Sequence, residues 1–209
     1  MRAHALSWML LSAAAASNPA ESKAQGPSVP LDCQPSRDRE RLATRASPYD
    51  STLIQVGARA AKICYSRPSV RGRVIFGELV PFDTLWRTGA DDPTIIHLPF
   101  SVEIGGMKLR PGKYSIYTVP GRQHWTIVVN ASTSQWGTTL DEGEFKSAYT
   151  AEVRAQEVGR AQVTPEPIAA PIEKFTIRSE PKGRDAVDLI LEWERTRVRV
   201  PLRLIPGSQ

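Results

Sequence analysis

One segment of the chain, residues 65–98, combines residue types that could bind or transform a small molecule. Its arginines carry forked N–H donors that suit a carboxylate, phosphate or sulfate, and Trp86 offers a flat apolar face to a sugar ring or a cation. Its acidic residues and one histidine could act as acid, base or metal ligands. The candidate binding residues are Arg67, Arg73, Trp86, Arg87, Asp91 and Asp92, and the candidate acid–base residues are Asp91, Asp92, Glu78 and His97.

The same residues also have a purely structural interpretation. Arg87 could form an ion pair with Asp91 or Asp92 that pins a long loop, and Trp86 could fill the hydrophobic core. A single strand histidine such as His97 is typically a packing residue, and its spacing to other His or Cys residues does not match a metal site. The chain has no Gly-x-Ser-x-Gly elbow, no phosphate-binding loop and no His-Glu-x-x-His motif, so we expect no cofactor and no metal.

The elements that would hold this segment are predicted by the alternation of apolar and polar residues. Runs at 102–104, 114–119, 125–129 and 174–178 alternate with a period of two, which is typical of half-buried strands. Turn signals that contain Gly and Pro separate these runs. We therefore expect an all-β fold, an antiparallel β-sandwich of jelly-roll or immunoglobulin-like type with about nine strands.

The C-terminal run 187–204 contains two alternating stretches that are joined by polar residues 194–196, which predicts a hairpin. Pro201 lies inside the second stretch, and because proline has no N–H to donate, that strand should be an edge strand or be bulged there. A short helix over 141–148 is the one interruption that we expect in the strand pattern.

The N-terminus predicts export. Arg2 precedes an apolar run, and small residues follow it, which is the layout of a secretory signal peptide with cleavage after Ala16 or Ala24. The run is too short for a membrane span of roughly 20 residues, and no later stretch is long enough, so we expect no transmembrane segment. The expected organisation is a signal peptide over 1–24, a flexible arm or linker over 25–47 and a single β-sandwich domain over 48–205, in a protein that is periplasmic or secreted.

Charge and cysteine content narrow the expected partners. The chain has 27 Lys and Arg against 22 Asp and Glu, and most arginines alternate with apolar residues as on a solvated sheet face, so we expect no nucleic-acid partner. A hydrophobic content of 41% is that of an ordinary globular protein and excludes wholesale disorder. In an exported chain, the two cysteines, Cys33 and Cys64, permit a disulfide, and the alternative is a pair of free thiols.

Several motifs of the chain are long enough to identify a family. They are Arg67-Pro68, Gly72-Arg73, Ile75-Phe76-Gly77, Trp86-Arg87-Thr88-Gly89-Ala90, Pro111-Gly112-Lys113-Tyr114-Ser115, Trp125-Thr126-Ile127 with Asn130, and Leu191-Glu192-Trp193 with Val200-Pro201. Over residues 47–204 the chain thereby resembles the exported bacterial family called domain of unknown function 2911. The resemblance implies no activity. One departure is at Asp91-Asp92, where relatives tend to read Asn-Glu, and the change of Asn to Asp replaces an amide donor with a pure acceptor.

Two functions fit these observations. We expect a non-enzymatic binding or structural module of the periplasm or envelope, whose polar-aromatic surface at 67–97 meets a small ligand or an envelope protein, because sandwich loops commonly carry binding surfaces. The alternative is a hydrolase or lyase that acts on a sugar or an ester. In that case Asp91, Asp92, Glu78 or His97 would do the acid–base work and Arg87 would hold the anionic part of the substrate.

Overall fold

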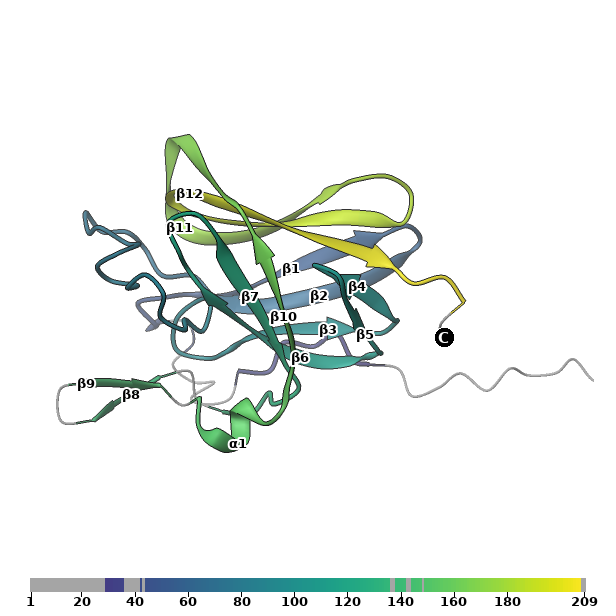
Figure 1. The fold of residues 1–209 in the computed structure, drawn as a ribbon, viewed down its shortest axis with the longest axis horizontal. Coiled ribbons are helices and arrows are strands. Elements are labelled where there is room, and N and C mark those ends of the chain that lie inside the picture. Colours follow the sequence, from purple (N-terminus) through teal and green to yellow (C-terminus); the bar gives the residue numbers. More distant parts are fainter. Residues whose placement is uncertain are drawn as a thin grey trace, which may run out of the picture.

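A six-stranded and a four-stranded antiparallel sheet form the body of the molecule in the computed structural model (Figure 1). The structure describes residues 29–35, 42, 44–135, 138–141, 144–147 and 149–207, with only the backbone described between 138 and 147. The predicted signal peptide over 1–24 lies outside these residues. The two sheets confirm the prediction of an all-β sandwich.

The larger sheet orders its strands as β1-β2-β3-β6-β7-β10. Its strand β2 ends at Ser66 and the neighbouring β3 begins at Thr94, so the candidate segment is the long connection between two paired strands. Figure 1 shows this connection leaving the sheets at the left of the view. The strands are β1 (Tyr49–Val56), β2 (Arg59–Ser66), β3 (Thr94–Leu98), β6 (Gly112–Val119), β7 (Trp125–Asn130) and β10 (Glu157–Val163).

The smaller sheet orders its strands as β11-β12-β4-β5. Its strands are β11 (Pro165–Pro181), β12 (Ala186–Leu204), β4 (Val102–Ile104) and β5 (Met107–Leu109).

The helix predicted over 141–148 is wrong, because the described residues there form a separate pair of strands, β8 (Thr138–Asp141) and β9 (Glu144–Ser147). A helix follows instead at α1 (Ala151–Arg154), where the side chain of Thr150 caps the first turn by accepting from the N–H of Val153. Among the described residues, no helix is long and apolar enough to cross a membrane.

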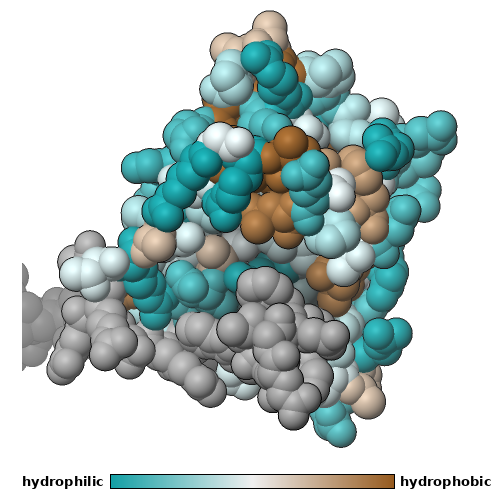
Figure 2. All heavy atoms as spheres, turned by 90° about the vertical axis from the view of Figure 1, so that its left-hand side faces the viewer, coloured by the Kyte–Doolittle hydropathy of each residue, from teal (hydrophilic) through white to brown (hydrophobic). Residues whose placement is uncertain are grey.

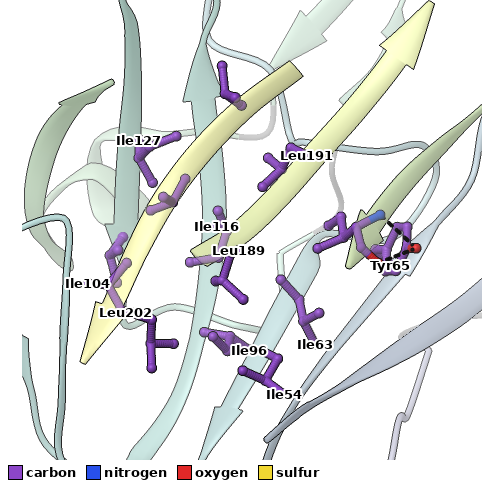
Figure 3. Close-up of a cluster of buried hydrophobic side chains, with 14 of the residues drawn as sticks. Ile54, Ile63, Tyr65, Ile96, Ile104, Ile116, Ile127, Leu189, Leu191 and Leu202 are labelled. Carbon is purple, nitrogen blue, oxygen red and sulfur yellow. Dashed lines mark hydrogen bonds between the residues drawn. The ribbon is translucent and has the colours of Figure 1, made fainter. Parts of the chain in front are cut away.

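The hydrophobic core lies between the two sheets. Figure 3 shows Leu189, Leu191 and Leu202 of β12 beside isoleucines of the six-stranded sheet. Ile63 of β2 and Ile96 of β3 are buried on the same side. Because side chains alternate between faces along a strand, the residues between these positions point to the outside of each sheet.

Tyr65 joins the six-stranded sheet to β11. Its hydroxyl donates to the carbonyl oxygen of Ile177 at 3.2 Å and accepts from the N–H of the same residue at 2.9 Å, as Figure 3 shows. Burial raises the pKa of Tyr65, so the hydroxyl keeps its proton and can make both bonds. This one side chain therefore satisfies two backbone groups at the junction of the sheets.

The predicted hairpin over 187–204 is confirmed, because β12 reverses direction near Glu194 (Figure 1) and its two ends meet where the N–H of Leu204 donates to the carbonyl oxygen of Asp185 at 2.8 Å. Its core side chains occupy odd positions up to Trp193 and even positions from Val198 onward. The pairing with β11 is irregular around Glu194 and Ile172, and Glu194 has a φ of +53°. The positive φ of Glu194 is typical of a tight hairpin turn, and this turn brings the odd positions of one arm and the even positions of the other to the same core face.

Pro201 lies where β12 changes its partner. The strand pairs with β11 as far as Val198 and with β4 from Leu202 onward. The missing N–H of Pro201 therefore falls between two ladders. The expectation of an edge strand or a bulge at Pro201 is met in a different form, since neither β11 nor β4 pairs with β12 at this residue.

Charged residues cover the outer face of the four-stranded sheet in pairs. Arg178 lies between Glu192 and Glu180 and donates hydrogen bonds to both carboxylates. Arg197 also donates to Glu192, and Arg199 donates to the other carboxylate, that of Glu180, at 2.6 Å. Burial opposes the ionised form of Glu192, but the hydrogen bonds from its two arginines outweigh it, and the pKa of that carboxyl is lowered. The charges of these arginines are thus neutralised within the sheet.

The described part of the N-terminal arm lies against the outer face of the six-stranded sheet. Cys33 forms a disulfide with Cys64 of β2, with 5.7 Å between the Cα atoms, which confirms the bond that the sequence permits. Because Ile63 faces the core, the neighbouring Cys64 points to the opposite face, where it is fully buried.

We expect the disulfide to stabilise the fold by about 2–4 kcal/mol, because it closes a loop of 31 positions and restricts the unfolded chain. Urea unfolding with and without a reducing agent measures this difference. The double variant Cys33→Ala/Cys64→Ala is the control and should unfold at the same urea concentration in both conditions. Equal stability of the oxidised and reduced wild type would contradict the prediction.

Candidate functional site

A groove of about 680 Å³ opens at the end of the sandwich, between the 67–93 loop, the arm at residues 46–47 and Trp193 of β12. Figure 2 looks onto this end of the molecule and shows hydrophobic side chains gathered near the centre, partly enclosed by hydrophilic ones. The apolar lining includes Pro68, Leu79, Val80, Pro81, Leu85 and Trp86, and the charged lining consists of Arg71, Arg73, Glu78, Arg87 and Asp91.

The backbone of Trp86 fixes the loop to the sheet. The N–H of Trp86 donates to the carbonyl oxygen of Thr118 in β6 at 2.7 Å, and its carbonyl oxygen accepts from the N–H of Thr118 at 2.9 Å. The indole Nε1 of Trp86 donates to the carbonyl oxygen of Gly89 at 3.0 Å, which closes the turn that follows. Trp86 therefore anchors the loop through both its backbone and its side chain.

The ring of Trp86 is part of the core. It is 9% exposed and stacks on Trp193, with ring centroids 5.7 Å apart and planes 18° apart. Phe76, Trp125 and Phe175 surround the pair at edge-to-face angles. The structural interpretation of Trp86 as a core side chain thus describes most of its surface, and only its edge contributes to the groove.

The residues after Arg87 hold the turn in an unusual backbone conformation. Thr88 has a φ of +58°, which is rare for a β-branched residue, and it is fully buried. Its carbonyl oxygen accepts from the hydroxyl of Thr94 at 2.6 Å. At Gly89 a Cβ atom would lie 3.0 Å from the carbonyl oxygen of Ser66, so a larger residue would push the loop away from β2.

Arg87 and Asp91 lie beside each other in the groove lining. Burial lowers the pKa of Arg87, while the charge of Asp91 and the hydroxyl of Tyr117 work in the opposite direction. Asp91 adopts a φ of +55°, a conformation that Asp and Asn tolerate better than most residues. Of the two loop aspartates, Asp91 is the one whose charge acts on Arg87, and Asp92 pairs with Arg45.

Asp92 forms a buried ion pair with Arg45 from the N-terminal arm. The Asp92 side chain is 2% exposed and does not line the groove. Burial, together with the nearby charge of Asp92, raises the pKa of Tyr49 to about 12. Asp92 is thus a structural clamp that ties the arm to the loop beside the groove.

Arg67 serves a similar structural purpose at the base of the loop. Its guanidinium donates to Asp50 at 2.9 Å, to the carbonyl oxygen of Phe175 at 3.0 Å and to the hydroxyl of Thr176 at 2.8 Å. These partners come from β1 and β11, so Arg67 links the two sheets. It lies outside the lining of the groove.

His97 lies on the face of β3 that the arm covers. Its Nδ1 donates to the carbonyl oxygen of Pro30 at 2.7 Å, and its Nε2 is 3.7 Å from the sulfur of Cys64. Burial lowers the pKa of His97 and outweighs the bond to Pro30, and nearby Lys113 and Lys62 lower it further. His97 is therefore a packing residue that holds the arm, as a single strand histidine is expected to be.

The structure thus brings together Arg73, Glu78, Trp86, Arg87 and Asp91 and leaves Arg67, Asp92 and His97 elsewhere. The sequence did not point to Trp193 or to the arm as parts of the groove. The alternation of residues 187–193 places Trp193 on the core face, and nothing in the sequence indicates that it also borders the loop. Among the described residues, no three His, Cys, Asp or Glu side chains come together as a set that could hold a metal ion.

Comparison with known proteins gives one match. The model of a family described as "Protein of unknown function (DUF2911)" matches residues 47–202, which includes the whole 67–93 loop. No curated protein and no solved structure matches the chain.

We expect Asp92→Asn to lower the free energy of unfolding by about 3 kcal/mol or more, because it removes the charge that faces the buried guanidinium of Arg45. The neighbouring variant Asp91→Asn is the matched control. It keeps a residue that tolerates the left-handed backbone and breaks no buried ion pair, so it should cost less than about 1 kcal/mol. Urea unfolding compares the two variants, and equal losses would show that Asp92 is no clamp.

Proposed function

We propose that this chain, which belongs to the DUF2911 family of proteins of unknown function, is a non-enzymatic module that binds a small ligand in the groove. The observation that carries the proposal is the groove itself. Its volume of about 680 Å³ is that of a small-molecule site, and it combines an apolar wall with a few charged groups. The family description names no activity.

The loop is built as a rigid support for such a site. Its backbone is fixed to β6 at Trp86, and the turn at Thr88 is held by a hydrogen bond from Thr94. A preformed site loses little conformational entropy when a ligand binds, so more of the contact energy appears as affinity. The charged lining residues therefore lie on a frame that is ordered before the ligand arrives.

A hydrolase or lyase has less support, because its four candidate acid–base residues are dispersed. Asp92 is committed to Arg45, and His97 holds the arm on the outer face of the sheet. Only Glu78 and Asp91 line the groove. A catalytic acid or base must reach the reacting atoms, so two of the four candidates are in the wrong place for that work.

Export remains part of the proposal. The N-terminal sequence has the layout of a signal peptide, and the disulfide between Cys33 and Cys64 is of the kind that persists in an oxidising compartment. The periplasm or the medium would provide that compartment. The candidate ligands are then small molecules of the envelope or of the surroundings.

We expect at least one compound in a panel of small carboxylates, phosphates, sugars and peptidoglycan fragments to raise the melting temperature of the purified protein. At one hundred times its Kd, a ligand stabilises the folded state by about 2.7 kcal/mol. The variant Thr84→Trp places a large side chain in the lining of the groove and should abolish the shift. Leu53→Trp, at an exposed position on β1 outside the groove, should keep it. A shift that survives Thr84→Trp would place the ligand elsewhere and refute the proposal.

We expect the double variant Glu78→Gln/Asp91→Asn to change ligand affinity without removing any turnover, because in the proposed module neither carboxylate does chemistry. Hydrolysis of a p-nitrophenyl ester panel and of glycosides, measured with wild type and variant, tests this. Hydrolysis by the wild type that falls at least about a hundredfold in the variant would favour the enzyme instead, since general acid–base groups contribute about that much or more.

A further inference from the structure

We propose that the ligand of the groove is an anion with an apolar body, whose carboxylate or phosphate head binds Arg71 and Arg73. The apolar body would lie along Leu79, Val80 and Leu85. This inference rests on the proposed function and adds to it the chemical class of the ligand.

A tight turn places the two arginines at the rim of the groove. The N–H of Arg73 donates to the carbonyl oxygen of Val70 at 3.1 Å, and the two residues between them have positive φ, +48° at Arg71 and +71° at Gly72. This is the pattern of a type I′ turn. The turn brings two guanidinium groups to one end of the groove.

Backbone carbonyls hold both guanidinium groups in place. Arg73 donates from Nε to the carbonyl oxygen of Val70 at 3.1 Å and from Nη2 to that of Ser69 at 2.7 Å. Arg71 donates from Nη2 to the carbonyl oxygen of Ala46 at 3.1 Å. These bonds orient the side chains but leave each with further N–H donors. A carbonyl carries no net charge, so the two positive charges are not neutralised as those on the four-stranded sheet are.

The acidic residues near the groove do not neutralise the positive charge of Arg71 and Arg73. Glu173 accepts from the backbone N–H of Arg71 at 3.0 Å and is not among the residues that line the groove. The charge of Asp91 acts on Arg87 and offsets part of the lowering of its pKa by burial. Glu78 and Asp91 together set two negative charges against the three arginines of the lining, which leaves a net positive charge. Guanidinium groups bind carboxylates and phosphates through paired N–H donors, so an anion is the complementary head group.

The walls favour an apolar body over a sugar ring. Leu79 is 44% exposed, whereas Trp86 is 9% exposed and Trp193 is 2% exposed. Sugar rings stack on open aromatic faces, and those of the two tryptophans are covered by each other and by the core. The indole Nε1 of Trp193 is buried and has no hydrogen-bond acceptor among the described residues.

The test is isothermal titration calorimetry of the purified protein with octanoate, octyl phosphate, 1-octanol and galacturonate. We expect octanoate or octyl phosphate to bind at least about tenfold more tightly than 1-octanol, since a hydrogen bond to a charged group is worth about one such factor or more. Comparison of the two anions shows which head group the site prefers. Raising the salt concentration should weaken both anions and leave 1-octanol unchanged.

Variants assign the effect to the turn. Arg71→Gly removes a guanidinium at a position where glycine fits the positive φ, so the turn should stay intact while octanoate binds about tenfold more weakly. Arg73→Lys keeps the charge and should retain part of the affinity that Arg73→Ala loses. Arg203→Ala, at an exposed arginine of β12 outside the groove, should bind octanoate like the wild type.

The outcomes separate this inference from the proposed function. Equal affinity for octanoate and 1-octanol would overturn the anionic head. Galacturonate binding that Thr84→Trp abolishes, with neither octyl anion bound, would overturn the apolar body and leave the groove as a binding site. Failure of every compound in both panels would overturn the inference and the proposed function together.

Discussion

The stack of Trp86 on Trp193 determines where the 67–93 loop can lie. Ordering a connection of this length costs on the order of 1–2 kcal/mol per residue in backbone entropy, which a solvated loop cannot recover. This loop recovers it by contributing Ile75, Val80 and Trp86 to the hydrophobic core between the sheets. Because Trp193 belongs to β12, the stack ties the loop to the four-stranded sheet, while the backbone of Trp86 ties it to β6. The groove exists because the loop is fixed at both points.

The same stack determines which residues of the loop remain available to a ligand. Because Trp86 is buried, its aromatic face is not available to a ligand. The neighbouring residues Thr88 and Gly89 form the turn that holds it. The chemistry of the loop is then left to side chains that the core does not use. Those are the arginines and carboxylates of the groove lining and the exposed part of its apolar wall. The aromatic residues of this segment therefore serve the packing of the core, and the polar residues of the lining serve the groove.

Local patterns predict the strands well and the long-range contacts poorly. Period-two alternation correctly indicated β4, β6, β7 and the core face of β12, because the environment of each side chain alternates along a strand. Alternation located the hairpin turn at Glu194, where the core face passes from odd to even positions. It gave no sign, however, that Asp92 pairs with Arg45, which lies 47 positions away. Alternation identifies the face on which a residue lies and carries no information on which distant residue meets it there.

The arginines show why composition alone could not identify the site. Arg67 and Arg178 are as basic as Arg71 and Arg73, but carboxylates neutralise the first two and carbonyl oxygens hold the second two. Only the second arrangement keeps a net positive charge that a ligand can use. Arg71 also occupies a left-handed backbone position where glycine or asparagine would form the same turn with less strain. The turn therefore keeps the backbone strain of a non-glycine residue at position 71. The fold gains nothing from that strain, so we infer that the arginine is kept for the position of its guanidinium.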